Sequence, residues 1–108
     1  MNIDFRQQGE IIVATVQENR LDAGSAPDFK IAMGELIDQG ATTVVIDLGQ
    51  VDFIDSSGLG ALIAMLKRLS KQGDLKIVGI RGMVKDLFKL TRMDRVFRLY
   101  DSVDQALA

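Results

Sequence analysis

Two adjacent serines with small neighbours form the segment of this chain best suited to chemistry, Asp55-Ser56-Ser57-Gly58-Leu59-Gly60. The segment lies where a buried strand should end and a helix should begin. The first backbone N–H groups of a helix have no partners within it, and together with the helix dipole they stabilise negative charge. The fold would therefore tolerate a phosphate on a serine here, and that phosphate would change the surface sharply. This position favours a switch over a catalyst.

The same residues could also do no more than cap a helix, since Asp and Ser are common at helix N-termini. Two serines are present where one cap would suffice, however. Gly58 and Gly60 leave the helix start uncrowded, although each costs about 1 kcal/mol of helix propensity relative to Ala. Ala61 and Ala64 continue this small surface with Met65 beside it, which would suit an adaptable protein contact. Good helix propensity explains the two alanines equally well.

Composition excludes most catalytic interpretations of these serines. The chain of 108 residues contains no His and no Cys. It therefore lacks the commonest general base and metal ligand, and a Ser-His-Asp triad is impossible within it. The Gly-x-Ser-x-Gly motif is absent, and Ser57 to Gly60 lack the Lys-Ser/Thr of a P-loop. We expect no catalytic residue, no metal and no cofactor.

Charge and hydropathy narrow the range of partners. Thirteen basic residues against 15 acidic ones give a net charge of −2, which argues against a nucleic-acid partner. No apolar run approaches the ~20 residues that span a bilayer, and the N-terminus shows no signal-peptide pattern. With no linker, repeat or low-complexity tract, we expect one domain over residues 1–108, in the cytoplasm and without membrane insertion.

The hydrophobic pattern predicts the order β-β-α-β-α-β-α-β-α, an α/β domain with a mixed sheet of about four or five strands packed with about four helices. The expected strands are residues 2–6, 10–17, 43–48, 75–80 and 96–99. Helices are expected from Ser25 to Gly40, at 57–72 and at 83–91, with a final turn capped by Ser102 and Gln105. Residues 19–24 are expected to be a loop. A right-handed crossover should join strands 43–48 and 75–80 in parallel.

Helical spacing selects the side chains expected in the core. They are Phe29, Met33, Leu36 and Ile37 in the first helix; Leu59, Leu62, Ile63, Leu66 and Leu69 in the second; and Val84, Leu87, Phe88 and Thr91 in the third. Met83 and Leu90 are left outside, which fits incomplete amphipathicity better than a docking face. The loop Arg20-Leu21-Asp22 should share a sheet edge with Asp55–Gly60, where it could contact a partner or form a solvated turn.

The segments Val44-Val45-Ile46-Asp47-Leu48 and Val51-Asp52-Phe53-Ile54-Asp55-Ser56-Ser57-Gly58-Leu59-Gly60 closely resemble bacterial anti-sigma factor antagonists of the STAS domain family. The resemblance spans essentially the whole chain, since the Leu21-Asp22 turn, the region 73–80 and the helix 84–88 fall in the family order. One departure is Asn19-Arg20, where many relatives carry a Gly, and it affects the shape expected of that loop.

The resemblance implies a protein-binding switch. The unphosphorylated antagonist binds a cognate anti-sigma factor, which is also a serine kinase, and so releases the sigma factor. The kinase then phosphorylates a serine at the start of the motif helix, which ends the interaction, and a serine phosphatase restores it. In this chain the phosphoacceptor would be Ser56. The residues expected to contact the partner are Asp22, Asp55, Ser57, Gly58, Gly60 and Ala61.

The family also includes members with other uses. Some are cytoplasmic components of lipid-transport systems, and others build large signalling assemblies. A scaffold or accessory subunit that uses the same surface without phosphorylation is therefore the alternative expectation. In neither case would this chain supply catalysis.

Overall fold

The computed structural model describes residues 1–108 as a mixed α/β fold with one main sheet in the strand order β1-β2-β4-β6-β7 and a two-stranded sheet, β3-β5. The main-sheet strands are Ile3–Gln8 (β1), Ile11–Val16 (β2), Thr43–Asp47 (β4), Asp74–Val78 (β6) and Arg98–Tyr100 (β7). The small sheet joins Arg20–Leu21 (β3) to Phe53–Ile54 (β5). The helices are Ala26–Asp38 (α1), Ser56–Leu69 (α2), Gly82–Leu90 (α3) and Val103–Leu107 (α4), with a 3-10 turn (η1) at Met93–Arg95. The predicted α/β fold with a five-stranded mixed sheet and four helices is confirmed.

Strand pairing brings the two candidate loops together. β2, β4 and β6 are parallel neighbours, so their carboxyl ends lie at one edge of the sheet. The chain leaves β2 and β4 at this edge and forms β3 and β5, which pair Leu21 with Ile54. The residues expected to form a loop at 19–24 therefore include a short strand. Two residues carry no periodicity, so this strand depends on its partner and not on local pattern.

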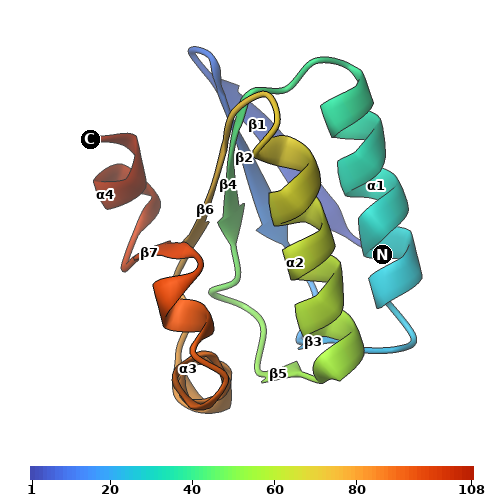
Figure 1. The fold of residues 1–108 in the computed structure, drawn as a ribbon, viewed down its shortest axis with the longest axis vertical. Coiled ribbons are helices and arrows are strands. Elements are labelled where there is room, and N and C mark those ends of the chain that lie inside the picture. The colour runs from blue at the N-terminus through green and yellow to red at the C-terminus, as the bar shows by residue number, and fades with distance from the viewer.

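Helices α1 and α2 pack against each other and cover one face of the main sheet (Figure 1). Most residues expected in the core are buried, as in the pair Phe29 and Leu62, both 0% exposed. Leu36, Ile63, Leu66 and Leu87 are only partly buried. Thr91 is exposed, contrary to expectation, because its hydroxyl donates to the carbonyl oxygen of Leu87 at 2.7 Å and stays at the helix end.

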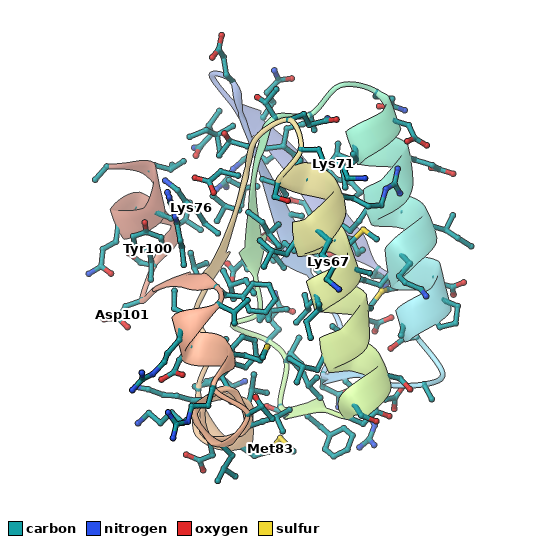
Figure 2. The ribbon with its side chains drawn as sticks, in the orientation of Figure 1. Lys67, Lys71, Lys76, Met83, Tyr100 and Asp101 are labelled. Atoms are coloured by element: carbon teal, nitrogen blue, oxygen red, sulfur yellow. The ribbon has the colours of Figure 1, made fainter.

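The opposite face of the sheet is covered only in part, by the short helix α4, which contacts β4, β6 and β7. A small cluster forms there from Val13, Val45, Val78 and Ala106. Lys76 and Tyr100 lie side by side near this helix (Figure 2), with the Lys76 ammonium 5.5 Å from the ring centre. That ammonium also donates to the carbonyl oxygen of Ala106 at 2.7 Å, which ties α4 to the sheet. The expected Ser102 cap is present, since its hydroxyl accepts from Gln105 N–H at 3.2 Å.

Element boundaries differ from expectation where side chains decide them. α2 begins at Ser56 and ends at Leu69 instead of extending to Gln72. The Gln72 side chain instead donates to the carbonyl oxygens of Ile37 and Ala41, joining this turn to the end of α1. The last strand begins at Arg98 because residues 93–95 form the 3-10 turn and Phe97 packs on Phe88, with ring centres 5.7 Å apart.

Candidate functional site

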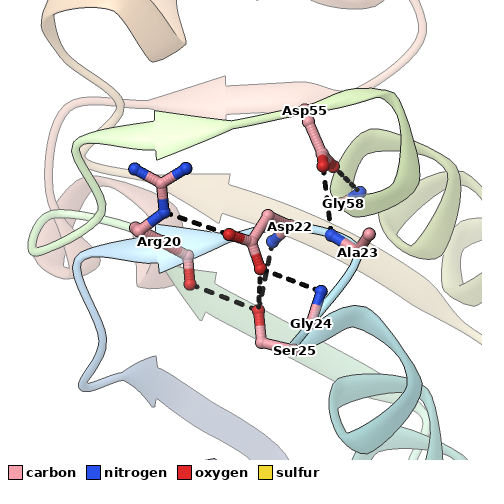
Figure 3. Close-up of polar contacts among 7 residues, drawn as sticks. All are labelled: Arg20, Asp22, Ala23, Gly24, Ser25, Asp55 and Gly58. Carbon is pink, nitrogen blue, oxygen red and sulfur yellow. Dashed lines mark hydrogen bonds and ion pairs between the residues drawn. The ribbon is translucent and has the colours of Figure 1, made fainter.

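The carboxylate of Asp55 joins the start of α2 to the loop after β3. Asp55 is the N-cap of α2 in an extended conformation, and its Oδ1 accepts from the N–H of Gly58 at 2.9 Å. Its Oδ2 accepts from the N–H of Ala23 at 3.0 Å (Figure 3). One side chain thus satisfies an orphan donor of the helix and fixes the neighbouring loop.

Asp22 organises its own loop with four hydrogen bonds that involve a side chain (Figure 3). Its Oδ2 accepts from Arg20 Nε at 3.0 Å, and its Oδ1 accepts from Gly24 N–H at 3.1 Å. Its backbone N–H donates to the hydroxyl of Ser25 at 3.1 Å. Ser25 stands at the N-cap of α1 but makes no capping bond there, so the expected side-chain cap is replaced by this contact with Asp22.

The Arg20 side chain holds Asp22 in its charged form. Its hydrogen bond lowers the pKa of the Asp22 carboxyl below the ordinary value of 3.8; partial desolvation opposes the shift and the Gly24 N–H adds to it. The Arg20 guanidinium also lies 4.2 Å from the centre of the Phe53 ring on the paired strand. The loop is therefore anchored to β5 through Arg20.

Gly58 lets α2 lie directly on β3. A Cβ at this position would overlap the carbonyl oxygen of Leu21 and stand 3.0 Å from Cγ2 of Ile54. At Gly60, in contrast, a Cβ would meet no atom within 4 Å. The first glycine is thus a packing requirement, whereas the second leaves open surface.

Ser56 and Ser57 are exposed in the first turn of α2. Asp55 already caps the helix, and neither serine hydroxyl takes part in a hydrogen bond of the structure. The fold therefore does not depend on these hydroxyls. They stand free at the positive end of a helix of 14 residues.

A shallow groove of about 420 Å³ lies beside these serines, between the start of α1 and the start of α2. Its lining consists of Ala23, Ala26, Pro27, Lys30, Ser57, Gly60 and Ala61. Lys30 is the one charged side chain among them. The groove joins the two segments that the sequence singles out.

The burial of three residues corrects the expected contact surface. Ala61 and Met65 are only 2% and 3% exposed, and Gly58 is buried as well. They serve the core because α2 packs against both α1 and the sheets, so its buried surface is wider than one stripe. Gly58 and Ala61 can shape a partner site from beneath but offer it little surface. Asp22, Asp55, Ser57 and Gly60 gather at one end of the molecule, as expected.

Three residues of the site are missed by the sequence reasoning: Ala23, Ser25 and Lys30. The spacing of Asp22 and Ser25 is a turn signal that could have revealed their contact. The other two depend on the approach of α1 to α2, which no local pattern contains. No group of three or more His, Cys, Asp or Glu side chains that could hold a metal ion is present. None of the helices is both long and apolar enough to cross a membrane.

Comparisons with known proteins agree with this architecture. The family model of the STAS domain matches residues 2–106. The anti-sigma-F factor antagonist RsfB of Mycobacterium tuberculosis is 29% identical over 81% of this chain and 71% of its own. The crystal structure of an anti-sigma factor antagonist from Mycobacterium paratuberculosis is 30% identical, with a TM-score of 0.88 over 98% of this chain and 90% of its own.

A more distant likeness concerns the fold alone. The anti-sigma factor antagonist SpoIIAA in its unphosphorylated form is 18% identical, with a TM-score of 0.73 over 98% of this chain and 94% of its own. The strand order, the parallel pair β3-β5 and the serine segment at the start of α2 thus occur in a chain matched almost throughout by one family model. This chain belongs to the STAS domain family.

Proposed function

We propose that this chain is an anti-sigma factor antagonist of the cytoplasm, switched by phosphorylation of Ser56. In its unphosphorylated form it binds a cognate anti-sigma factor that is also a serine kinase, and the sigma factor is released. Phosphorylation of Ser56 ends the interaction, and a serine phosphatase restores it. The names of the relatives support the antagonist role.

The free hydroxyl of Ser56 is the observation that carries this proposal. Asp55 performs the capping that a serine at this junction could otherwise perform. Ser56 is exposed and its hydroxyl makes no hydrogen bond, so a kinase can reach it without unfolding the helix. The solved structures of SpoIIAA include a phosphorylated form, so this fold is compatible with a phosphorylated state.

The transfer itself requires chemistry from the partner. The Ser56 oxygen attacks the γ-phosphorus of ATP, the bond to the β-phosphate oxygen breaks, and ADP leaves. The hydroxyl proton passes to a base of the kinase, as it does in the phosphoryl transfer of protein kinases. Metal and phosphate-binding groups would likewise come from the kinase. This chain supplies an acceptor held on a rigid helix end.

The effect of the phosphate is electrostatic. It adds about −1.5 to −2 charge at neutral pH, beside the Asp55 carboxylate in a chain of net charge −2. The backbone N–H groups of the α2 N-terminus reduce the internal cost. A partner packed on the same surface would instead face a hydrated dianion, and losing about 3 kcal/mol of binding lowers affinity more than a hundredfold. The switch therefore needs no refolding.

Incubation with the kinase-type anti-sigma factor of the same genome and ATP tests the assignment. Intact-mass spectrometry should show the gain of one phosphoryl group, lost in Ser56→Ala and retained in Ser57→Ala. The second variant is a matched control, since it removes a neighbouring exposed hydroxyl from the same helical turn. Equal modification of Ser56→Ala would show that Ser56 is not the acceptor. Binding without any phosphorylation would favour a scaffold or accessory role.

A further inference from the structure

β1 forms an unprotected edge of the main sheet. It is the terminal strand of the order β1-β2-β4-β6-β7, and all of its residues but Ile3 are exposed. It is six residues long, contains no Pro and pairs with β2 without a bulge. The other edge strand, β7, has three residues and is contacted by η1 and α4. Long, regular edges are templates for a further strand.

The register with β2 shows which backbone groups of β1 are free. The carbonyl oxygen of Asn2 accepts from Gln17 N–H at 2.8 Å, so these two residues form a hydrogen-bonded pair. Such pairs alternate with non-hydrogen-bonded pairs along an antiparallel ladder. The even-numbered residues of β1 therefore direct their backbone groups to β2. Ile3, Phe5 and Gln7 direct theirs to the open edge.

The sequence of this edge is complementary to itself. If a second copy adds its β1 antiparallel with the two Phe5 residues opposite, Ile3 faces Gln7 of the second copy. These pairs can form roughly six backbone hydrogen bonds. Between them Asp4 faces Arg6 of the second copy, twice by symmetry, in the pairs where cross-strand side chains approach most closely.

In the neighbouring registers, Asp4 no longer faces Arg6 of the second copy. Keeping the free backbone groups paired requires a shift of two residues in the pairing. Centring the pairing on Asp4 places two Asp4 carboxylates opposite each other, and centring it on Arg6 places two Arg6 guanidiniums opposite. Like charges directly opposite are destabilising. Charge thus selects the register centred on Phe5.

The apolar face of β1 agrees with the same arrangement. Phe5 is 42% exposed on the side of the sheet that carries α1, and Ile31 of α1 is 61% exposed. A groove of about 280 Å³ lies between Phe5 and α1, lined by Phe5, Ala32, Glu35, Leu36 and Gln39. In the register centred on Phe5, the ring of the second copy lies beside this ring and shields it from water.

We infer that β1 is a homodimer interface, at which a second copy of this chain adds its own β1 antiparallel about Phe5 and extends the main sheet across a twofold axis. This inference is independent of the proposed switch, because it uses neither Ser56 nor any residue that is expected to contact the anti-sigma factor. The mode is β-strand addition, with main-chain bonds supplying affinity and the Asp4–Arg6 pairs supplying register.

Charge reversal tests the interface without disturbing the core, since Asp4 and Arg6 are both exposed. Sedimentation equilibrium of the wild-type chain should show a reversible dimer. Asp4→Arg and Arg6→Asp should each raise the dimer Kd about tenfold or more, because each places like charges opposite twice. The double variant Asp4→Arg/Arg6→Asp should return to within about threefold of wild type. Asp86→Arg on α3, with the same change in net charge as Asp4→Arg, is the control and should leave Kd unchanged.

Amide hydrogen exchange gives an independent measurement. The amides of Ile3, Phe5 and Gln7 should exchange more slowly as protein concentration rises, whereas those of Asp4 and Arg6 are protected at all concentrations. A wild-type chain that stays monomeric at millimolar concentration would overturn the inference. A dimer whose Kd is unchanged in the two single variants, or is not restored in the double variant, would also overturn it.

Discussion

The Oδ2 of Asp55 accepts a hydrogen bond from the N–H of Ala23 at 3.0 Å, across 32 positions of sequence. The same carboxylate caps α2 through Gly58. The Asp55 carboxylate therefore holds the start of α2 and the loop that carries Asp22 in a fixed position relative to each other. A partner that touches both segments meets a surface already in place, with little ordering entropy to lose on binding.

Two substitutions at Asp55 should separate its roles. Asp55→Ala removes the cap and should destabilise the fold by about 1–2 kcal/mol. Asp55→Asn can still accept from Gly58 N–H, but its NH₂ group cannot accept from Ala23, so we expect a loss of about 1 kcal/mol or less. Urea denaturation followed by circular dichroism measures both. Equal losses in the two variants would contradict separate roles for the two oxygens.

The two glycines of the motif should respond in opposite directions. Gly58→Ala drives a methyl group into the Leu21 carbonyl and should cost about 1–3 kcal/mol. Gly60→Ala meets no atom within 4 Å, so helix propensity should stabilise the fold by up to about 1 kcal/mol. Thermal and urea unfolding of this matched pair provide the measurement. A stabilised Gly58→Ala would mean that α2 does not lie against β3 as described.

Asp22 should titrate below its ordinary pKa of 3.8 because of Arg20. A carboxyl whose pKa is lowered on folding contributes stability that is present above its unfolded pKa and is lost as pH falls through the lower folded pKa. Arg20→Gln should therefore move the Asp22 pKa back upward and weaken this acid-side dependence. An NMR pH titration that follows the Gly24 amide, which donates to Asp22, measures the change. An unaltered midpoint in Arg20→Gln would contradict the assigned cause.

Periodicity and turn signals were sufficient to predict the main elements, the α/β class and the proximity of the two loops. The parallel order of β2 and β4 is enough to bring residues 20–22 and 55–60 to one edge. The short strand β3 could not be predicted, because it exists only through its pairing with β5. The burial of Ala61 and Met65 depends on how α1 meets α2, and this is a tertiary property.

The resemblance to anti-sigma factor antagonists of the STAS domain family implies a phosphoacceptor at Ser56, which residue types and spacing alone do not. Spacing alone permits either a capped helix or a switch at Ser56. The structure assigns the cap to Asp55, which leaves the serine hydroxyl without a structural partner. This division of labour between adjacent residues could not be predicted from residue types, since Asp and Ser are both good caps.

A charged residue in place of Ser56 should mimic the phosphorylated form, whereas a neutral one should behave as the unphosphorylated form. Ser56→Asp places a carboxylate at the start of α2 and should weaken capture of the anti-sigma factor, whereas Ser56→Ala should bind near the wild-type level. Both variants keep the Asp55 cap, so their folding stabilities should stay within about 0.5 kcal/mol of each other. Equal capture by the two variants would contradict a charge-based switch.

The most direct measurement is the affinity of the wild-type chain for the kinase-type anti-sigma factor before and after stoichiometric phosphorylation. Calorimetric titration in the absence of ATP keeps each form unchanged during the measurement. We predict at least a hundredfold loss of affinity on phosphorylation. The amide chemical shifts of the phosphorylated chain should differ from those of the unphosphorylated chain only in the region of Asp22 and Asp55–Gly60. Equal affinity of the two forms would contradict the account.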